Sequence, residues 1–175
     1  MKKFPLLLLD ANVVILLFEE GIWEQVVGVC DIHLAATVVG EAKYYEDRQG
    51  CRHRIDLASY ERRGVISIHS EPVSSISSLK ARFGADILDR LDDGEAESLA
   101  IICRSSDEFN MCSSDHIVFR ILGALGVSER GISLAEVLQV AGLARQLPRQ
   151  FTKEFRDEWT KKGFTDGIQG FGMKS

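Results

Sequence analysis

The sequence lacks a long hydrophobic stretch and an excess of positive charge. The apolar run after Pro5 lasts four residues before Asp10 interrupts it, which is too short for the core of a signal peptide. No run approaches the roughly 18 residues that a membrane-spanning helix needs. We therefore expect a cytoplasmic protein with no membrane association. The net charge of -5 argues against a surface built only to grip nucleic acid, so a nucleic-acid substrate would need a local basic face.

Closely spaced cysteine pairs are also missing, because none of the four cysteines forms a Cys-x-x-Cys motif. A chain of 175 residues with 45% hydrophobic residues can bury a core without disulfides, so reduced thiols are the simple interpretation. A zinc site that uses Cys30 with His33, and Cys51 with His53, is an alternative, although neither pair has the usual spacing. One compact domain is expected.

Apolar runs alternate along the chain with segments of helical periodicity. Strands are expected at residues 6–9, 32–36, 65–69 and 109–112. Helices are expected at residues 13–27, from Thr37 through Glu41, at 42–63 with a break at Gly50, at 71–91 with a break near Gly84, and from Asp92 onward. This alternation implies right-handed crossovers and a parallel sheet with helices on both faces. The expected fold class is α/β, a three-layer α/β/α sandwich with a central, mainly parallel sheet.

The chain is expected to divide into a main domain, residues 1–147, and a C-terminal helical extension, residues 148–175. Pro148 interrupts the pattern, and Phe151, Phe155 and Trp159 give residues 151–162 a helical periodicity. The glycine-rich end, residues 167–175, is expected to be mobile.

Four acids occur where such a fold brings its strand ends together. Asp10 and Asp115 follow strands, whereas Glu41 and Glu95 lie early in helices that begin at the same sheet edge. Two unit charges about 4 Å apart repel by roughly 4 kcal/mol at an effective dielectric near 20, so such a group favours a bound divalent cation. Carboxylate oxygens suit Mg²⁺ or Mn²⁺, which activate water and stabilise the attacking and leaving oxygens of phosphodiester hydrolysis.

The residues around these acids resemble the PIN domain. The matching pieces are LLLLDANVVI at residues 6–15, Glu41 after the second strand, LDDGEAE at 91–97, and CSSD at 112–115. The resemblance covers about residues 4–143. It implies a PIN-like fold and Mg²⁺- or Mn²⁺-dependent endoribonuclease activity, as in the VapC-type toxins of bacterial and archaeal toxin-antitoxin pairs. It also implies an RNA substrate, an antitoxin protein as a partner to look for, and a homodimer.

The resemblance assigns roles residue by residue. The positions that match the metal-binding acids are Asp10, Glu41 and Asp115, with Glu95 where many members have aspartate. Asn12 and Ser113 match polar residues that orient the acids and their waters. Glu97 is a further candidate ligand, but on a helix it lies about 200° around from Glu95.

Each of these residues also has a structural interpretation. Asp10 can simply end a strand, and Glu41 can complement a helix dipole. Asp92 and Glu95 fit a variant of the capping box, which needs no metal. A solvated helix face is the alternative for Glu97, and His116, next to Asp115, is interpreted as a helix-start residue.

Residues 43–63 carry most of the candidate phosphate contacts. The cationic side chains of this segment are Lys43, Arg48, Arg52, His53, Arg54, Arg62 and Arg63. Interleaved acids make an ordinary exposed helix the alternative. The pair Tyr44 and Tyr45 can stack a base or pack within the fold.

Two other functions compete with the nuclease. A phosphatase of the haloacid dehalogenase type also opens with an aspartate after a strand, but it needs a second aspartate where this chain has Asn12. A PIN-like module that binds a partner without catalysis is the second alternative.

Overall fold

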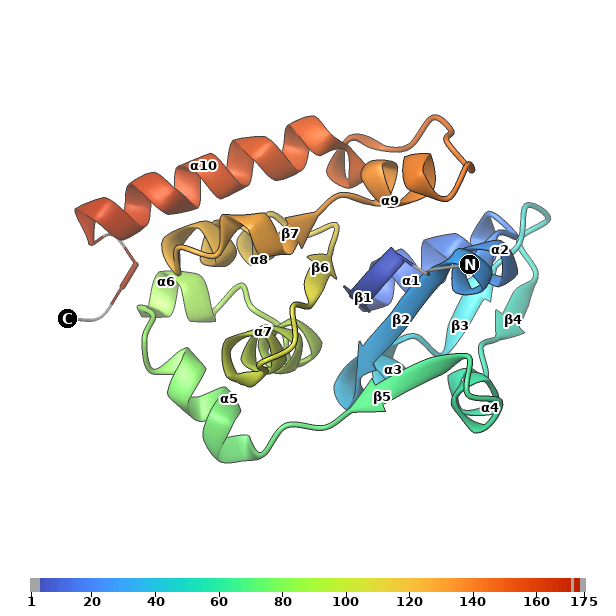
Figure 1. Ribbon diagram of the computed structural model, residues 1–175, viewed down its shortest axis with the longest axis horizontal. Helices are drawn as coiled ribbons and strands as arrows, with labels where there is room; N and C mark the ends of the chain where they lie inside the picture. Colours follow the sequence, from blue (N-terminus) through green and yellow to red (C-terminus); the bar gives the residue numbers. More distant parts are fainter. Residues whose placement is uncertain (1–3, 171, 174–175) are drawn as a thin grey trace.

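A parallel sheet of five strands forms the centre of the molecule (Figure 1). The computed structural model of the protein describes residues 4–170, 172 and 173. The strand order is β5-β2-β1-β6-β7, with bounds β1 (Phe4–Leu9), β2 (Cys30–Ala35), β5 (Ile66–His69), β6 (Asn110–Cys112) and β7 (Gly131–Ile132). Helices cover both faces of this sheet, so the expected α/β/α sandwich is confirmed.

The ten α-helices of the described chain are mostly short. They are α1 (Ala11–Glu19), α2 (Trp23–Val29), α3 (Ala36–Glu41), α4 (Leu57–Arg62), α5 (Val73–Lys80), α6 (Ala85–Leu88), α7 (Asp93–Arg104), α8 (His116–Ala124), α9 (Leu134–Val140) and α10 (Lys153–Gln169). None of these helices combines the length and hydrophobicity needed to cross a membrane.

Two groups of buried side chains hold the layers together. The first joins β1 and β2 to α1, α2 and α9, and the second joins α5, α7 and α8. Leu8, Leu9, Ile32 and Leu34 are fully buried, as expected of continuous apolar runs in strands that are covered on both faces. The hydrophobic runs of the sequence therefore predict the central strands correctly.

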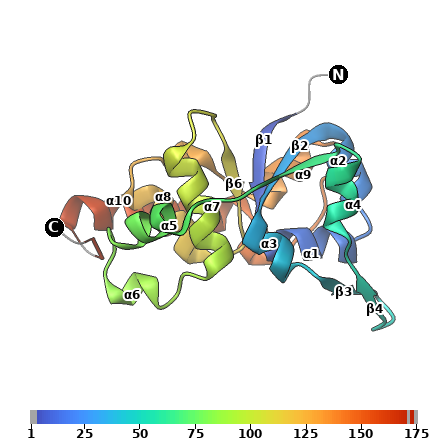
Figure 2. The same cartoon turned by 90° about the horizontal axis from the view of Figure 1, so that it is seen from below.

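The helical structure expected at residues 42–63, with a break at Gly50, is wrong for the part before α4 (Leu57–Arg62). The chain instead forms an antiparallel hairpin of β3 (Tyr44–Glu46) and β4 (Arg52–Arg54), followed by α4 (Figure 2). The turn is closed by Asp47, whose Oδ1 accepts hydrogen bonds from the N–H groups of Gln49 and Cys51, both at 2.9 Å. Gly50 adopts a φ of 77°, which favours glycine and stops a helix.

The helix expected at residues 13–27 is interrupted in a similar way. Gly21 has a φ of 66° and separates α1 from α2. The helix expected from Thr37 through Glu41 begins one residue earlier, at Ala36, and its N-cap is Ala35. The hydroxyl of Thr37 donates to Glu97 at 2.7 Å.

The C-terminal extension forms α10, which packs along α8 (Figure 1). Glycines allow this close approach: a Cβ on Gly163 would lie 1.9 Å from the carbonyl oxygen of Arg120, and one on Gly123 would lie 2.2 Å from that of Thr160. At the end of the chain, Phe83 pairs with Met173 in a β-bridge. Of the end that was expected to be mobile, residues 171, 174 and 175 lie outside the described residues.

We predict that Gly163→Ala lowers the free energy of unfolding by about 2 to 3 kcal/mol, because its new methyl group meets backbone rather than a movable side chain. Chemical denaturation followed by circular dichroism measures this change. The matched control is Gly28→Ala in α2, where a Cβ meets nothing within 4 Å; it should gain up to about 1 kcal/mol from helix propensity. Equal stability of the two variants would contradict the packing described for α10.

Candidate functional site

The candidate site lies where the chain reverses its progress across the sheet. From β1 the chain moves through β2 to β5, and it later returns to the other side of β1 through β6 and β7. Leu9 and Cys112, the last residues of β1 and β6, are paired in register. Asp10 and Ser113 therefore begin neighbouring loops at the carboxyl ends of the strands, which is where open α/β sheets bind ligands.

The carboxylate of Asp10 is buried and accepts three hydrogen bonds. Oδ1 accepts from the N–H of Val13 at 2.7 Å, so Asp10 is the N-cap of α1. Oδ2 accepts from the Ser113 hydroxyl at 2.5 Å and from the Ser114 N–H at 2.9 Å. Burial raises the pKa of Asp10, although these hydrogen bonds oppose the shift. Asp10 therefore ends a strand, caps a helix and anchors the loop after β6.

Ser113 links Asp10 to the segment that carries Asp115. Its hydroxyl, fully buried, donates to Asp10 and also accepts from the Asp115 N–H at 3.0 Å. Asp115 is the N-cap of α8, and its Oδ1 accepts from the Ile117 N–H at 2.8 Å. The structure thus gives Ser113 the orienting contacts that its position in the sequence suggested.

His116 stands between Asp115 and the C-terminal extension. Its Nδ1 lies 3.1 Å from Oδ1 of Asp115, and its ring lies 4.6 Å from that of Trp159 on α10. As expected, His116 is the first residue of a helix, α8. The extension therefore reaches the neighbourhood of one of the four acids.

Glu95 combines a structural and an electrostatic role. The capping box is confirmed: Asp92 Oδ1 accepts from the Glu95 N–H at 2.7 Å, and the Asp92 N–H donates to Glu95 Oε2 at 3.2 Å. The side chain of Glu95 is buried, and this burial, together with the charges of Asp115, Asp92 and Asp10, raises its pKa to about 9. The acids are therefore close enough to oppose each other's ionisation.

Glu41 approaches this group through a gap left by a glycine. A Cβ on Gly94 would lie 2.6 Å from Oε2 of Glu41, and the Gly94 N–H donates to the Glu41 carboxylate. Desolvation is the first cause of its raised pKa, with the charges of Asp92, Asp93 and Asp10 contributing. A side chain at position 94 would occupy the space that the Glu41 carboxylate fills.

The sequence indicates only a helix-capping role for Asp92, yet its charge raises the pKa of Asp10, Glu41 and Glu95 alike. A signal was present in the sequence, since Asp92 belongs to the same LDDGEAE segment as Glu95. The acid group defined by these contacts and charges is Asp10, Glu41, Asp92, Glu95 and Asp115.

Glu97 is buried but serves other partners. Its Oε2 accepts from the N–H and hydroxyl of Thr37 at 2.8 and 2.7 Å, and its Oε1 accepts from the Glu71 N–H at 2.9 Å. These bonds tie α7 to the start of α3 and to the loop after β5. The alternative interpretation of Glu97 as part of a solvated helix face is wrong, because the side chain is buried. We assign Glu97, a candidate metal ligand from the sequence, to hydrogen bonding rather than to the acid group.

The remaining candidate site residues, Asn12 and the histidines of the alternative zinc site, are not part of the acid group. Asn12 lies in the first turn of α1 with an exposed side chain. The histidines of the alternative zinc site have other partners, because His33 Nδ1 lies 2.7 Å from His69 Nε2 and His53 Nε2 lies 2.7 Å from Asp47 Oδ2. Neither histidine is paired with a cysteine by these contacts.

The donor set of the acid group consists of carboxylate oxygens, which suits a hard divalent cation. The gap at Gly94 and the raised pKa values of Asp10, Glu41 and Glu95 fit such an ion, because a positive charge would offset burial and mutual repulsion. Within residues 4–170, 172 and 173, however, no group of three or more His, Cys, Asp or Glu side chains is arranged to hold a metal ion. Binding would therefore require the carboxylates to move closer together.

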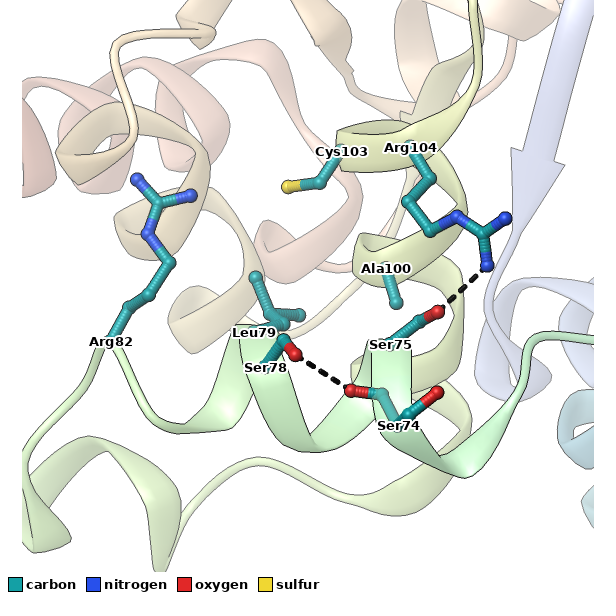
Figure 3. Close-up of a pocket in the computed structure, with 8 residues that line it drawn as sticks. All are labelled: Ser74, Ser75, Ser78, Leu79, Arg82, Ala100, Cys103 and Arg104. Carbon is teal, nitrogen blue, oxygen red and sulfur yellow. Dashed lines mark hydrogen bonds between the residues drawn. The ribbon is translucent and has the colours of Figure 1, made fainter.

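A separate pocket of about 370 Å³ lies between α5 and α7 (Figure 3). It is lined near the C-terminal end of α7 by Ala100, Cys103 and Arg104, whereas Glu95 lies at the other end of this helix. Arg104 is held by Glu71 at 2.9 Å and by Ser75 at 2.7 Å. This pocket is not part of the acid group.

We predict that Glu95→Gln raises stability in metal-free buffer at about pH 8 by about 1 to 3 kcal/mol. A group whose folded pKa is raised from 4.5 to about 9 contributes stability that is complete below about pH 4.5 and is lost as the pH rises toward 9. Glutamine keeps the capping bond but carries no charge. Thermal unfolding at about pH 5 and pH 8 should therefore show the gain only at the higher pH.

Asp10→Asn is the matched comparison. Relief of repulsion alone would make it stabilising, but an amide NH₂ would face either the Val13 N–H or the donors Ser113 and Ser114. We expect a loss of about 1 to 3 kcal/mol from the unsatisfied donors. A gain in melting temperature for Asp10→Asn would show that charge relief outweighs its hydrogen bonds.

Comparison with known proteins adds no assignment to this geometry. The sequence matches no protein-family model and no curated protein.

Proposed function

We propose that this protein is a metal-dependent endoribonuclease of the PIN type, which hydrolyses phosphodiester bonds of RNA. The observation that carries the proposal is the acid group at the switch point of the sheet. Four separate segments supply its carboxylates, and the pKa of Glu95 rises to about 9 because burial and the charges of Asp115, Asp92 and Asp10 act together. Repulsion between carboxylates gathered in this way destabilises the fold in the absence of a cation. With a cation bound, the same carboxylates would hold an ion that can activate water.

Asp10, Glu41, Glu95 and Asp115 would hold one or two Mg²⁺ or Mn²⁺ ions. When bound, such an ion lowers the pKa of water and neutralises charge on phosphate oxygens. Ser113 fixes the orientation of Asp10 and the backbone before Asp115 through two hydrogen bonds. Asp92 holds the first turn of α7, so that Glu95 stays at the edge of the group.

The order of the acids along the chain and the polar residue Asn12 favour a PIN-like nuclease over the haloacid dehalogenase type, which needs an aspartate at this position. A VapC-like toxin with an antitoxin partner, a homodimeric state and a cytoplasmic location belong to the same proposal and rest on the resemblance of the sequence. A PIN-like module without catalysis is the remaining alternative, and an activity measurement separates it.

The test is cleavage of labelled single-stranded RNA by purified protein with and without Mn²⁺. Wild type should cleave only with metal, and Asp115→Asn should reduce the rate at least about 100-fold, because the variant removes a charged ligand. Glu108→Gln is the matched control: it changes an exposed acid before β6 rather than the acid that follows this strand. Equal cleavage by wild type and Asp115→Asn would point to a contaminant and reject the proposal.

A second prediction uses Gly94→Ala to separate metal binding from folding. The added methyl group would meet the movable end of Glu41, so the melting temperature of the metal-free protein should stay within about 2 °C of wild type. Displacement of Glu41 should weaken Mn²⁺ binding about tenfold or more, as measured by calorimetry. Unchanged Mn²⁺ affinity would remove Glu41 from the proposed ligands.

A further inference from the structure

The β3–β4 hairpin follows Glu41 directly and carries different side chains on its two faces. Residues that face each other across the strands are Tyr44 with Arg54, Tyr45 with His53, and Glu46 with Arg52. Tyr45 packs against Phe18 with ring centroids 5.6 Å apart, which anchors one face to the core. The opposite face, which we call the Tyr44 face, carries Tyr44, Glu46, Arg52 and Arg54, all exposed.

The lysine and arginines of this hairpin form none of the ion pairs found among the described residues. Residues 43–54 contain four lysine or arginine residues and two acids in a chain of net charge -5. Ion pairs among the described residues include none of these cations, Lys43, Arg48, Arg52 and Arg54, although many other arginines of the chain are paired. One of the acids, Asp47, is occupied by His53 at 2.7 Å and by the turn. The hairpin is thus a preformed local basic surface.

Tyr44 stands between two hollows on this surface. One, of about 320 Å³, is lined by Lys43, Tyr44 and Arg54 among others, and the second, of about 430 Å³, by Tyr44, Tyr45 and Arg52 with two acids. The guanidinium carbon of Arg52 lies 4.1 Å from the centroid of the Tyr44 ring. Each hollow therefore combines an aromatic wall with at least one cation.

We propose that the Tyr44 face, together with the neighbouring Lys43, is a binding site for single-stranded nucleic acid, in which Tyr44 stacks on a base and Lys43, Arg52 and Arg54 contact phosphates. Exposed aromatic rings beside unpaired cations are the combination that binds single strands, because every base has a stackable face and every linkage has a charge. A duplex keeps its bases stacked and hidden from such a ring. An acidic peptide would use the cations but would not need the ring.

This proposal deepens the proposed nuclease function and rests on it for its biological meaning. Only two residues separate Glu41 from Tyr44, and the Lys43 N–H donates to the Glu41 carbonyl oxygen at 2.8 Å. A strand held on the Tyr44 face would thus lie close to a residue of the acid group. The basic hairpin would also offset the repulsion between the acids and the phosphates of RNA.

The test is fluorescence anisotropy with a labelled RNA of about 12 nucleotides, in EDTA and at about 50 to 200 mM NaCl. Tyr44→Ala should weaken single-strand binding about tenfold, while Tyr44→Phe, which keeps the ring, should bind like wild type. The combined change Arg52→Gln and Arg54→Gln should reduce the slope of log affinity against log salt by about 1. Matched controls are Phe164→Ala, an exposed aromatic on α10, and Arg149→Gln, an exposed arginine outside residues 43–63.

Several outcomes would overturn the proposal. These are unchanged affinity of Tyr44→Ala, equal binding of a duplex of the same length, or equal competition by a glutamate-rich peptide, which would identify an acidic protein partner. Because EDTA removes metal, binding is measured without cleavage. If Tyr44→Ala binds RNA as tightly as wild type in a protein that still cleaves RNA, only this binding site is rejected. If binding depends on Tyr44 but the protein never cleaves RNA, only the nuclease function is rejected.

Discussion

The hydrogen bonds of the Asp10 carboxylate are the interaction on which the acidic edge depends. By accepting from Val13, Ser113 and Ser114, Asp10 joins the end of β1 to the start of α1 and to the loop after β6. The fold therefore needs a carboxylate at a buried position, and burial raises its pKa. Any further acid at this edge of the sheet lies close to the Asp10 carboxylate, which the backbone hydrogen bonds already require. The fold and the proposed chemistry thus share one residue.

Helix α7 shows how position decides the role of two similar side chains. Glu95 and Glu97 are both buried on the same helix. Burial and the charges of Asp115, Asp92 and Asp10 raise the pKa of Glu95 to about 9. Glu97 points to other elements, where Thr37 and Glu71 supply three donors to its two oxygens. A rotation of about 200° along the helix is enough to convert a candidate metal ligand into a structural clamp.

Two segments outside the central sheet, the C-terminal extension and the β3–β4 hairpin, lie next to acids of the acid group. The extension packs α10 onto α8 through glycines and brings Trp159 against His116, beside Asp115. The hairpin continues directly from Glu41 and concentrates unpaired cations in a chain that is acidic overall. One segment thus supports the helix that Asp115 caps, and the other supplies positive charge near Glu41. The positive charge of the hairpin would suit the RNA substrate proposed above.

The sequence by itself determined the α/β class, the central strands and the order of the acids, because apolar runs and strand-end residues are local patterns. It also indicated the capping box of Asp92 and Glu95. Only the tertiary structure decided that residues 44–54 form a hairpin instead of a helix. The turn at Asp47 and Gly50 is held by pairing of the two strands and by packing of Tyr45 on Phe18. It likewise separated Glu97 from Glu95 and added Asp92 to the acid group. These outcomes depend on which distant side chains meet, which local periodicity does not encode.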